Sequence, residues 1–168
     1  MTAALCASAM VAQAGDNDHK KDSEALGWLI VVDQNEIDMA KAAKSRKLDP
    51  AVIEFADLMI EEHSKNLDQT NEMSKKLNIH AAKNKDAHKL EKKGHDKLKT
   101  LSKEDDKKFQ KEYVEGMVKG HKDALEELQK KVDEVSKDLK DHFVETKDHV
   151  ANHLEKAKDL QKQMDDKK

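Results

Sequence analysis

Apolar residues recur in alternating steps of three and four along four long stretches of this chain. Between Val114 and Val135 the pattern is interrupted only by His121. Residues at this spacing share one face of an α-helix, and a long face of this kind packs against other helices. The pattern therefore predicts an all-α protein. Its four expected helices span residues 22–46, 50–77, 103–134 and 137–165.

The composition agrees with helices. The 168 residues include one Pro, five Gly, one Trp, one Tyr and three Phe, which are too few turn and strand formers for a sheet-rich domain. The length suits a single domain. The 32 basic and 35 acidic residues are interspersed, for a net charge of −3. This balance provides no electrostatic basis for a nucleic-acid or anionic-membrane partner.

Local signals set the helix boundaries. Asp49 and Pro50 form a cap followed by proline at the first helical position. Ser102 to Asp105 fits a capping box, and Ser136 is the expected break between the last two helices. Residues 78–101 are polar and are interpreted as a connector with room for a short helix. The matched lengths predict an antiparallel, ferritin-like four-helix bundle. The alternative is one continuous helix over the last two segments.

The amino-terminal segment is typical of a secretory signal peptide. Residues 3–14 form an apolar run that is too short to span a membrane and ends in the small-x-small sequence Ala12-Gln13-Ala14. We expect cleavage after Ala14, a mature domain over residues 15–168, and a periplasmic or secreted protein without an integral membrane segment. The basic residues that normally precede such a run are absent, so a cytosolic amino terminus is the alternative. Cys6 would be removed, which leaves no thiolate ligand.

Each apolar stripe is broken by one ionisable residue. These four residues are Glu36, His63, His121 and His153. Each lies about 18–26 Å from its nearest turn at ~1.5 Å per residue, so an antiparallel bundle places them at a similar level. Three imidazoles and one carboxylate suit a divalent transition metal ion such as zinc, copper, nickel or iron. Two alternatives remain: a hydrogen-bonded network that sets the helix register, and a metal-dependent enzyme.

Other chemistry has less support in the sequence. A di-iron carboxylate centre requires Glu-x-x-His motifs, and the chain contains none. His142 and His149 fall beside the stripe and are interpreted as solvated. Tyr113, two turns before His121, is expected to be a hydrogen-bonded core residue. The connector histidines are also expected to be solvated; they are His80, His88 and His95.

Short motifs in register resemble the domain of unknown function 4142 family. They are Asn35-Glu36-Ile37, Met59-Ile60-Glu61-Glu62-His63-Ser64-Lys65-Asn66, Phe109-Gln110-Lys111-Glu112-Tyr113 with His121, and Leu139-Lys140 followed by His153-Leu154. The resemblance implies a ferritin-like four-helix fold, usually in secreted or periplasmic bacterial proteins, and no established activity. It also implies that Glu36, His63, Tyr113, His121 and His153 occupy the family's motif positions. Gln110 and Asp148 depart from the family pattern, which usually has Asp and often has Pro there.

Overall fold

The computed structural model describes residues 7–166, with side chains from residue 18 onward, and every element in this range is a helix. The helices are α1 (Ala7–Lys44), α2 (Pro50–Leu77), α3 (Lys85–Leu101), α4 (Asp106–Glu134) and α5 (Lys137–Asp166). The prediction of an all-α protein is confirmed. The four-helix bundle is not confirmed, because residues 7–166 contain five helices. The additional helix, α3, lies in the segment interpreted as a connector with room for a short helix.

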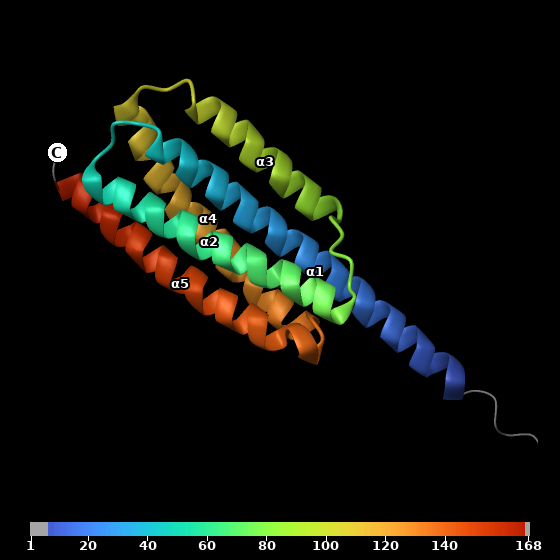
Figure 1. The fold of residues 1–168 in the computed structure, drawn as a ribbon. Coiled ribbons are helices and arrows are strands. Elements are labelled where there is room, and N and C mark those ends of the chain that lie inside the picture. Colours follow the sequence, from blue (N-terminus) through green and yellow to red (C-terminus); the bar gives the residue numbers. More distant parts are fainter. Residues whose placement is uncertain (1–6, 167–168) are drawn as a thin grey trace, which may run out of the picture.

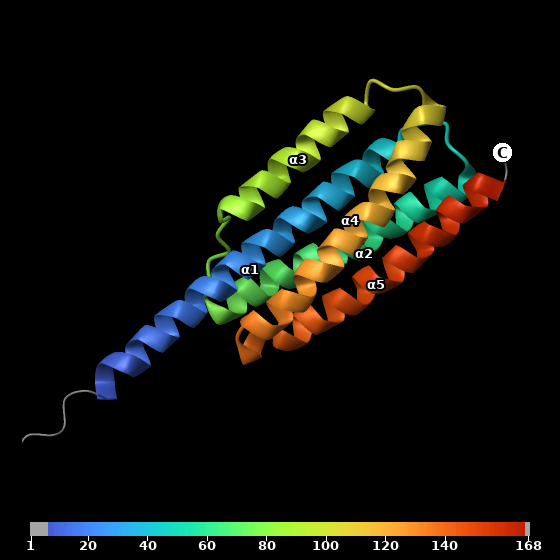
Figure 2. The same cartoon turned by 180° about the vertical axis from the view of Figure 1, so that it is seen from behind.

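The four long helices lie side by side, and α3 lies along the outer side of α1 (Figures 1 and 2). Helices α1 and α2 form one antiparallel pair, and α4 and α5 form another. At its amino-terminal end, α1 extends past the other helices (Figure 1). Helices α2, α4 and α5 contribute His63, His121 and His153, respectively, to the interior between the pairs.

Helix α3 forms because its polar sequence still carries a narrow apolar stripe. Asn84 caps its start by accepting hydrogen bonds from the backbone N–H groups of Asp86 (3.1 Å) and Ala87 (2.9 Å). Ala87 is buried, and a Cβ atom at Gly94 would collide with the side chain of Asn35 on α1. Close packing on α1 therefore stabilises α3, the short helix for which the predicted connector had room.

The helix boundaries test the local signals directly. Asp49 caps α2 by accepting from the Ala51 N–H at 3.0 Å, which confirms the Asp49-Pro50 start. Ser102 was expected to open the next helix, but it ends α3, and Asp105 caps α4 by accepting from the Lys108 N–H at 2.9 Å. Helix α4 thus starts at Asp106, three residues later than predicted, because α3 extends to Leu101.

The chain breaks at Ser136, as predicted. Helix α4 ends at Glu134 and α5 begins at Lys137, so the two are separate. The carboxylate of Asp22 on α1 accepts a hydrogen bond from the Ser136 N–H at 2.8 Å. This long-range bond satisfies a backbone group in the turn, and the continuous-helix alternative is wrong.

The amino-terminal prediction falls partly outside the described residues. Of the predicted signal peptide 1–14, residues 1–6 are not described, and the remainder belongs to α1, which runs through the predicted cleavage position. Helix α1 therefore begins well before the predicted start at residue 22. Among the described residues, none of the helices combines the length and apolar character that crossing a membrane requires.

The buried apolar residues form two clusters along the bundle. The first apolar cluster includes Trp28, Leu128 and Phe143, and the second includes Met59 and Phe109. On α2, α4 and α5, a buried histidine lies in the sequence between the residues of the two clusters. On α5, the residues that recur in steps of three and four from Leu139 to Leu160 are all buried. On α2, the same steps predicted Ile53, Ala56 and Ile60; Ala56 is buried, but Val52, Phe55 and Met59 are buried in place of the other two.

Candidate metal centre

Three buried histidines from three different helices meet between the apolar clusters. His63 on α2, His121 on α4 and His153 on α5 are 3%, 2% and 2% exposed. Their ring centroids are separated by 5.8 Å (His63–His121), 5.1 Å (His63–His153) and 5.3 Å (His121–His153). One ring nitrogen from each lies within 4.8 Å of the others. We call these three residues the histidine centre.

Each ring of the histidine centre has one nitrogen that faces an acceptor oxygen. Nδ1 of His121 donates to the backbone carbonyl of Met117 at 2.8 Å. Nε2 of His153 donates to Oε2 of Glu62 at 2.8 Å, and Nδ1 of His63 lies 2.9 Å from Oδ1 of Asp33. Oxygen partners of this kind fix the orientation of an imidazole and leave the lone pair of its other nitrogen available.

The remaining nitrogen of each ring is buried without a partner. Among the described residues, five buried side-chain atoms have no hydrogen-bond partner. Three are Nε2 of His63, Nε2 of His121 and Nδ1 of His153. The other two are Oε2 of Glu36 and the hydroxyl of Tyr113. Buried polar atoms without partners are costly, so these five atoms are the candidates for contact with a bound ligand.

Burial favours the neutral form of two of the three rings, those of His63 and His153. It lowers the pKa of His63 to about 4, against the opposing effect of the nearby negative charge of Glu36. Burial likewise lowers the pKa of His153 to about 4, with a further contribution from His63. At neutral pH these rings therefore offer lone pairs rather than positive charges, which is the form that binds a metal ion.

Asp33 is a part of the site that the sequence reading missed. Its carboxylate is fully buried and accepts hydrogen bonds from the amide of Asn66 at 3.1 and 2.9 Å, besides contacting His63. Burial raises the pKa of Asp33 well above its ordinary value, although the bond from Asn66 opposes this. The available signal was a carboxylate directly after Ile30-Val31-Val32, one turn before Glu36.

Glu36 does not belong to the cluster of potential ligand atoms within 4.8 Å of one another, which consists of His63, His121 and His153. Its carboxylate lies near α4, where a Cβ atom at Gly120 would be 3.6 Å from Oε1. Its charge acts on His63, and it also adds to the effect of burial in raising the pKa of Tyr113. Tyr113 is buried, as expected, but its hydroxyl has no partner rather than the hydrogen bond we predicted.

The remaining histidines divide into two groups. His142 was expected to be solvated but is buried, and its Nε2 donates to Oγ1 of Thr70 at 2.9 Å. It lies on the α5 face that meets α2, and burial lowers its pKa. His149 is 49% exposed, as expected for a position beside the stripe. The connector histidines are also exposed; they are His80, His88 and His95.

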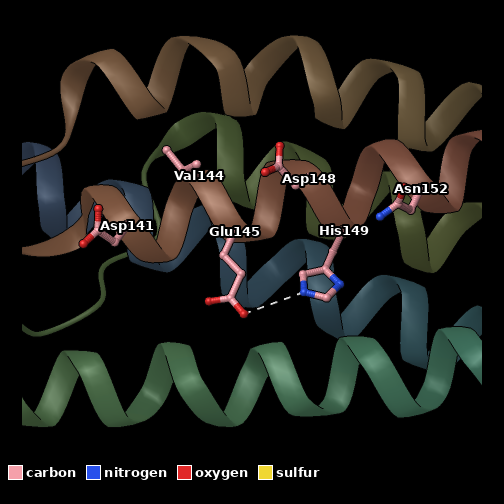
Figure 3. A pocket seen from close by; sticks show the side chains of 6 residues that line it. All are labelled: Asp141, Val144, Glu145, Asp148, His149 and Asn152. Atoms are coloured by element: carbon pink, nitrogen blue, oxygen red, sulfur yellow. Dashed lines mark ion pairs between the residues drawn. The ribbon is translucent and has the colours of Figure 1, made fainter.

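Two hollows lie on the surface near α5. The larger, of about 380 Å³, is formed by exposed α5 residues that include Asp141, Glu145 and His149 (Figure 3). The smaller, of about 190 Å³, lies between α2 and α5 and is lined by two members of the histidine centre, His63 and His153. We call it the α2–α5 cleft. The larger hollow has no such contact with the histidine centre.

Comparison with known proteins identifies the family. A family model described as "Domain of unknown function (DUF4142)" matches residues 7–160, which is nearly the whole chain. Searches of curated proteins and of solved structures found no match. The matched range contains the histidine centre, Glu36 and Tyr113. The protein belongs to the DUF4142 family.

Proposed function

We propose that this protein binds one divalent transition metal ion at the histidine centre. The observation that carries the proposal is the set of three unpartnered nitrogens, on three buried rings that lie close together. In each ring the second nitrogen is already engaged by an oxygen, so the free lone pair faces the interior without competition. An ion bound to these nitrogens would remove the cost of burying them unpaired.

The donor set limits the kind of ion. Three imidazole nitrogens suit zinc, copper, nickel or iron(II), and a three-histidine set leaves a position for a further ligand. Glu36 is our candidate for the compensating negative charge, since its unpartnered oxygen acts electrostatically on His63. Glu36 would become an oxygen ligand through a movement of its side chain toward the histidine centre when the ion binds.

The proposed biological role is metal storage, sensing or stress tolerance outside the cytoplasm. The support for this location is the apolar segment that ends in Ala12-Gln13-Ala14. Mass spectrometry of protein from its native host should find a mature chain that begins at Gly15. A soluble cytosolic form with an intact Met1 would contradict export, but it would leave metal binding untouched.

Metal counting tests the central proposal. The untagged protein is stripped with a chelator, dialysed against zinc or copper, and analysed for metal content per chain. We expect one ion per chain, and we expect His63→Ala, His121→Ala or His153→Ala to lose it. His142→Ala is the matched control, because it removes a buried imidazole whose bonding nitrogen already has Thr70 as a partner. If the unmodified protein binds no ion, the polar residues are a network that sets helix register.

A metal-dependent enzyme is a second candidate, and one observation favours it. The α2–α5 cleft reaches His63 and His153, so a small molecule could approach an ion held there. Three histidines with an open position resemble catalytic zinc sites in their donor set. The zinc-loaded protein should then hydrolyse a small activated ester faster than the His121→Ala variant. Equal rates would exclude this activity for that substrate class.

A further inference from the structure

The α2–α5 cleft connects the histidine centre to a polar pair at the surface. Glu62 on α2 and His149 on α5 both line the cleft, together with His63 and His153. Their side chains are 32% and 49% exposed, whereas His153 is 2% exposed. The cleft therefore places an exposed carboxylate and an exposed imidazole next to two buried imidazoles.

A single carboxylate oxygen joins the surface to the interior. Oε2 of Glu62 accepts a hydrogen bond from Nδ1 of exposed His149 at 3.2 Å and from Nε2 of buried His153 at 2.8 Å. Glu62 therefore connects the exposed ring of His149 to the buried ring of His153 through one oxygen atom.

The neighbourhood of His149 adds further negative charge. Glu145, one turn earlier on α5, places Oε1 3.8 Å from Nε2 of His149. Figure 3 shows both side chains extending from α5 toward α2, whereas Val144 and Asp148 extend to the other side. Lys65 also lines the cleft, so its rim contains one cation among the carboxylates. An imidazole nitrogen beside carboxylate oxygens is a donor set that attracts divalent transition metal ions.

For an ion, movement along the bundle axis would be less favourable than movement through the α2–α5 cleft. On α2 and α4, the turn preceding each histidine of the histidine centre contributes Met59 and Met117, which belong to the second apolar cluster. Val150, one turn before His153, belongs to the first apolar cluster. Passage through either cluster would strip the ion of water without providing replacement ligands.

We propose that Glu62 and His149 form an entry site, where a divalent transition metal ion binds briefly before it reaches the histidine centre. This inference rests on the proposed function. The ion would exchange water for the carboxylate of Glu62 and the ring of His149, and would then pass along the cleft to His153 and His63. Glu62 has a second role as a positioning residue, because it orients the ring of His153.

Loading kinetics test the entry site. Cobalt(II) is mixed rapidly with the metal-free protein, and its absorbance reports the binding rate; release is measured with a chelator. His149→Ala should slow loading and release by the same factor and leave the dissociation constant unchanged, because it alters only the path. His88→Ala is the control, since it removes an exposed histidine on α3, away from the cleft.

Glu62→Gln sharpens the test through charge. It should slow loading at low salt by about tenfold, and the loss should shrink as added salt screens the carboxylate. It should also weaken affinity, because Gln supports the ring of His153 less well than a carboxylate does. A slower rate that is independent of salt would mean that Glu62 acts only by positioning, which would overturn its part in the entry site.

Each outcome separates the two proposals. If the unmodified protein binds cobalt(II) and His149→Ala loads at the same rate or faster, the entry site is wrong and metal binding stands. If His149→Ala weakens affinity without slowing loading, His149 is a ligand or a structural support, and the entry site is also wrong. If the unmodified protein binds no cobalt(II), zinc or copper, both proposals fail.

Discussion

The histidine centre and the two apolar clusters are equally buried, but burial affects their stability differently. Phe109 and Phe143 are fully buried, and His121 and His153 are each 2% exposed. Apolar side chains gain stability from burial itself. Buried imidazoles gain it only if both nitrogens find partners, and in the histidine centre one nitrogen of each ring has none. Equal burial therefore stabilises one region and leaves the other dependent on a ligand.

The largest loss of stability is expected from a substitution in an apolar cluster, where burial alone stabilises the fold. Phe143→Ala removes a fully buried ring from the first apolar cluster and should lower the free energy of unfolding by about 3–5 kcal/mol. Denaturant unfolding with and without zinc measures this loss. The loss should be the same in both conditions, and a loss that depended on zinc would break the distinction between the regions.

Acid should destabilise the metal-free protein through the histidine centre. The pKa of His63 and of His153 is about 4 in the folded state, against an ordinary value of ~6.5 in the unfolded chain. Between these values the unfolded chain binds more protons, so the stability present above ~6.5 is lost as the pH falls toward 4, by a few kcal/mol. The raised pKa of Asp33 partly opposes this, since protonation of Asp33 favours the folded state.

Unfolding curves at several pH values check the acid effect. Replacement of both histidines by Gln should flatten the pH dependence in this range. An unchanged slope in that double variant would place the acid sensitivity elsewhere in the protein.

His121→Leu should abolish the dependence of stability on metal. Leucine leaves no unpaired ring nitrogen, so the metal-free variant should be at least as stable as the unmodified protein. It should lose the stabilisation by metal, which is about 2.7 kcal/mol when free metal is a hundred times the dissociation constant. Thermal unfolding with and without zinc measures both effects, and His88→Ala should keep the full metal response. A His121→Leu variant that still responds to zinc would exclude His121 as a ligand.

Asp33→Asn should have the smallest effect on folding and a specific effect on the ion. The amide keeps an oxygen near Nδ1 of His63 but removes the charge that supports the ring. Loss of such a partner typically weakens metal affinity by about 10- to 100-fold. Competition against a chelator of known affinity measures the change. Unchanged affinity would show that Asp33 supports the fold alone.

The three histidines were predictable because helix periodicity is local. Steps of three and four place His63, His121 and His153 on the buried faces of their own helices, and similar distances from the turns place them at one level. The same local rules predicted the Asp49-Pro50 start and the break at Ser136. These features need no knowledge of how neighbouring helices are rotated.

The partners of the histidines depended on that rotation. Asp33 and Glu62 lie beside the predicted stripes, where a sequence pattern indicates solvent. Asp33 nevertheless contacts His63 within the α1–α2 pair, and Glu62 contacts His153 between α2 and α5. Glu36 lies on its stripe, yet it is outside the group of converging nitrogens. The rotation of each helix about its own axis decides which neighbouring side chain reaches a ring. The pattern within a single helix does not predict this rotation.

Sequence alone thus determined that the chain is helical and that three imidazoles are buried at one level, because 3.6-residue periodicity and turn residues act within each segment. Tertiary structure decided that residues 85–101 form α3 against α1, which nitrogen of each ring is engaged, and which face of the bundle opens to the histidine centre. These features arise from contacts between helices, where the energy of an atom depends on which partner from another segment lies within hydrogen-bond distance.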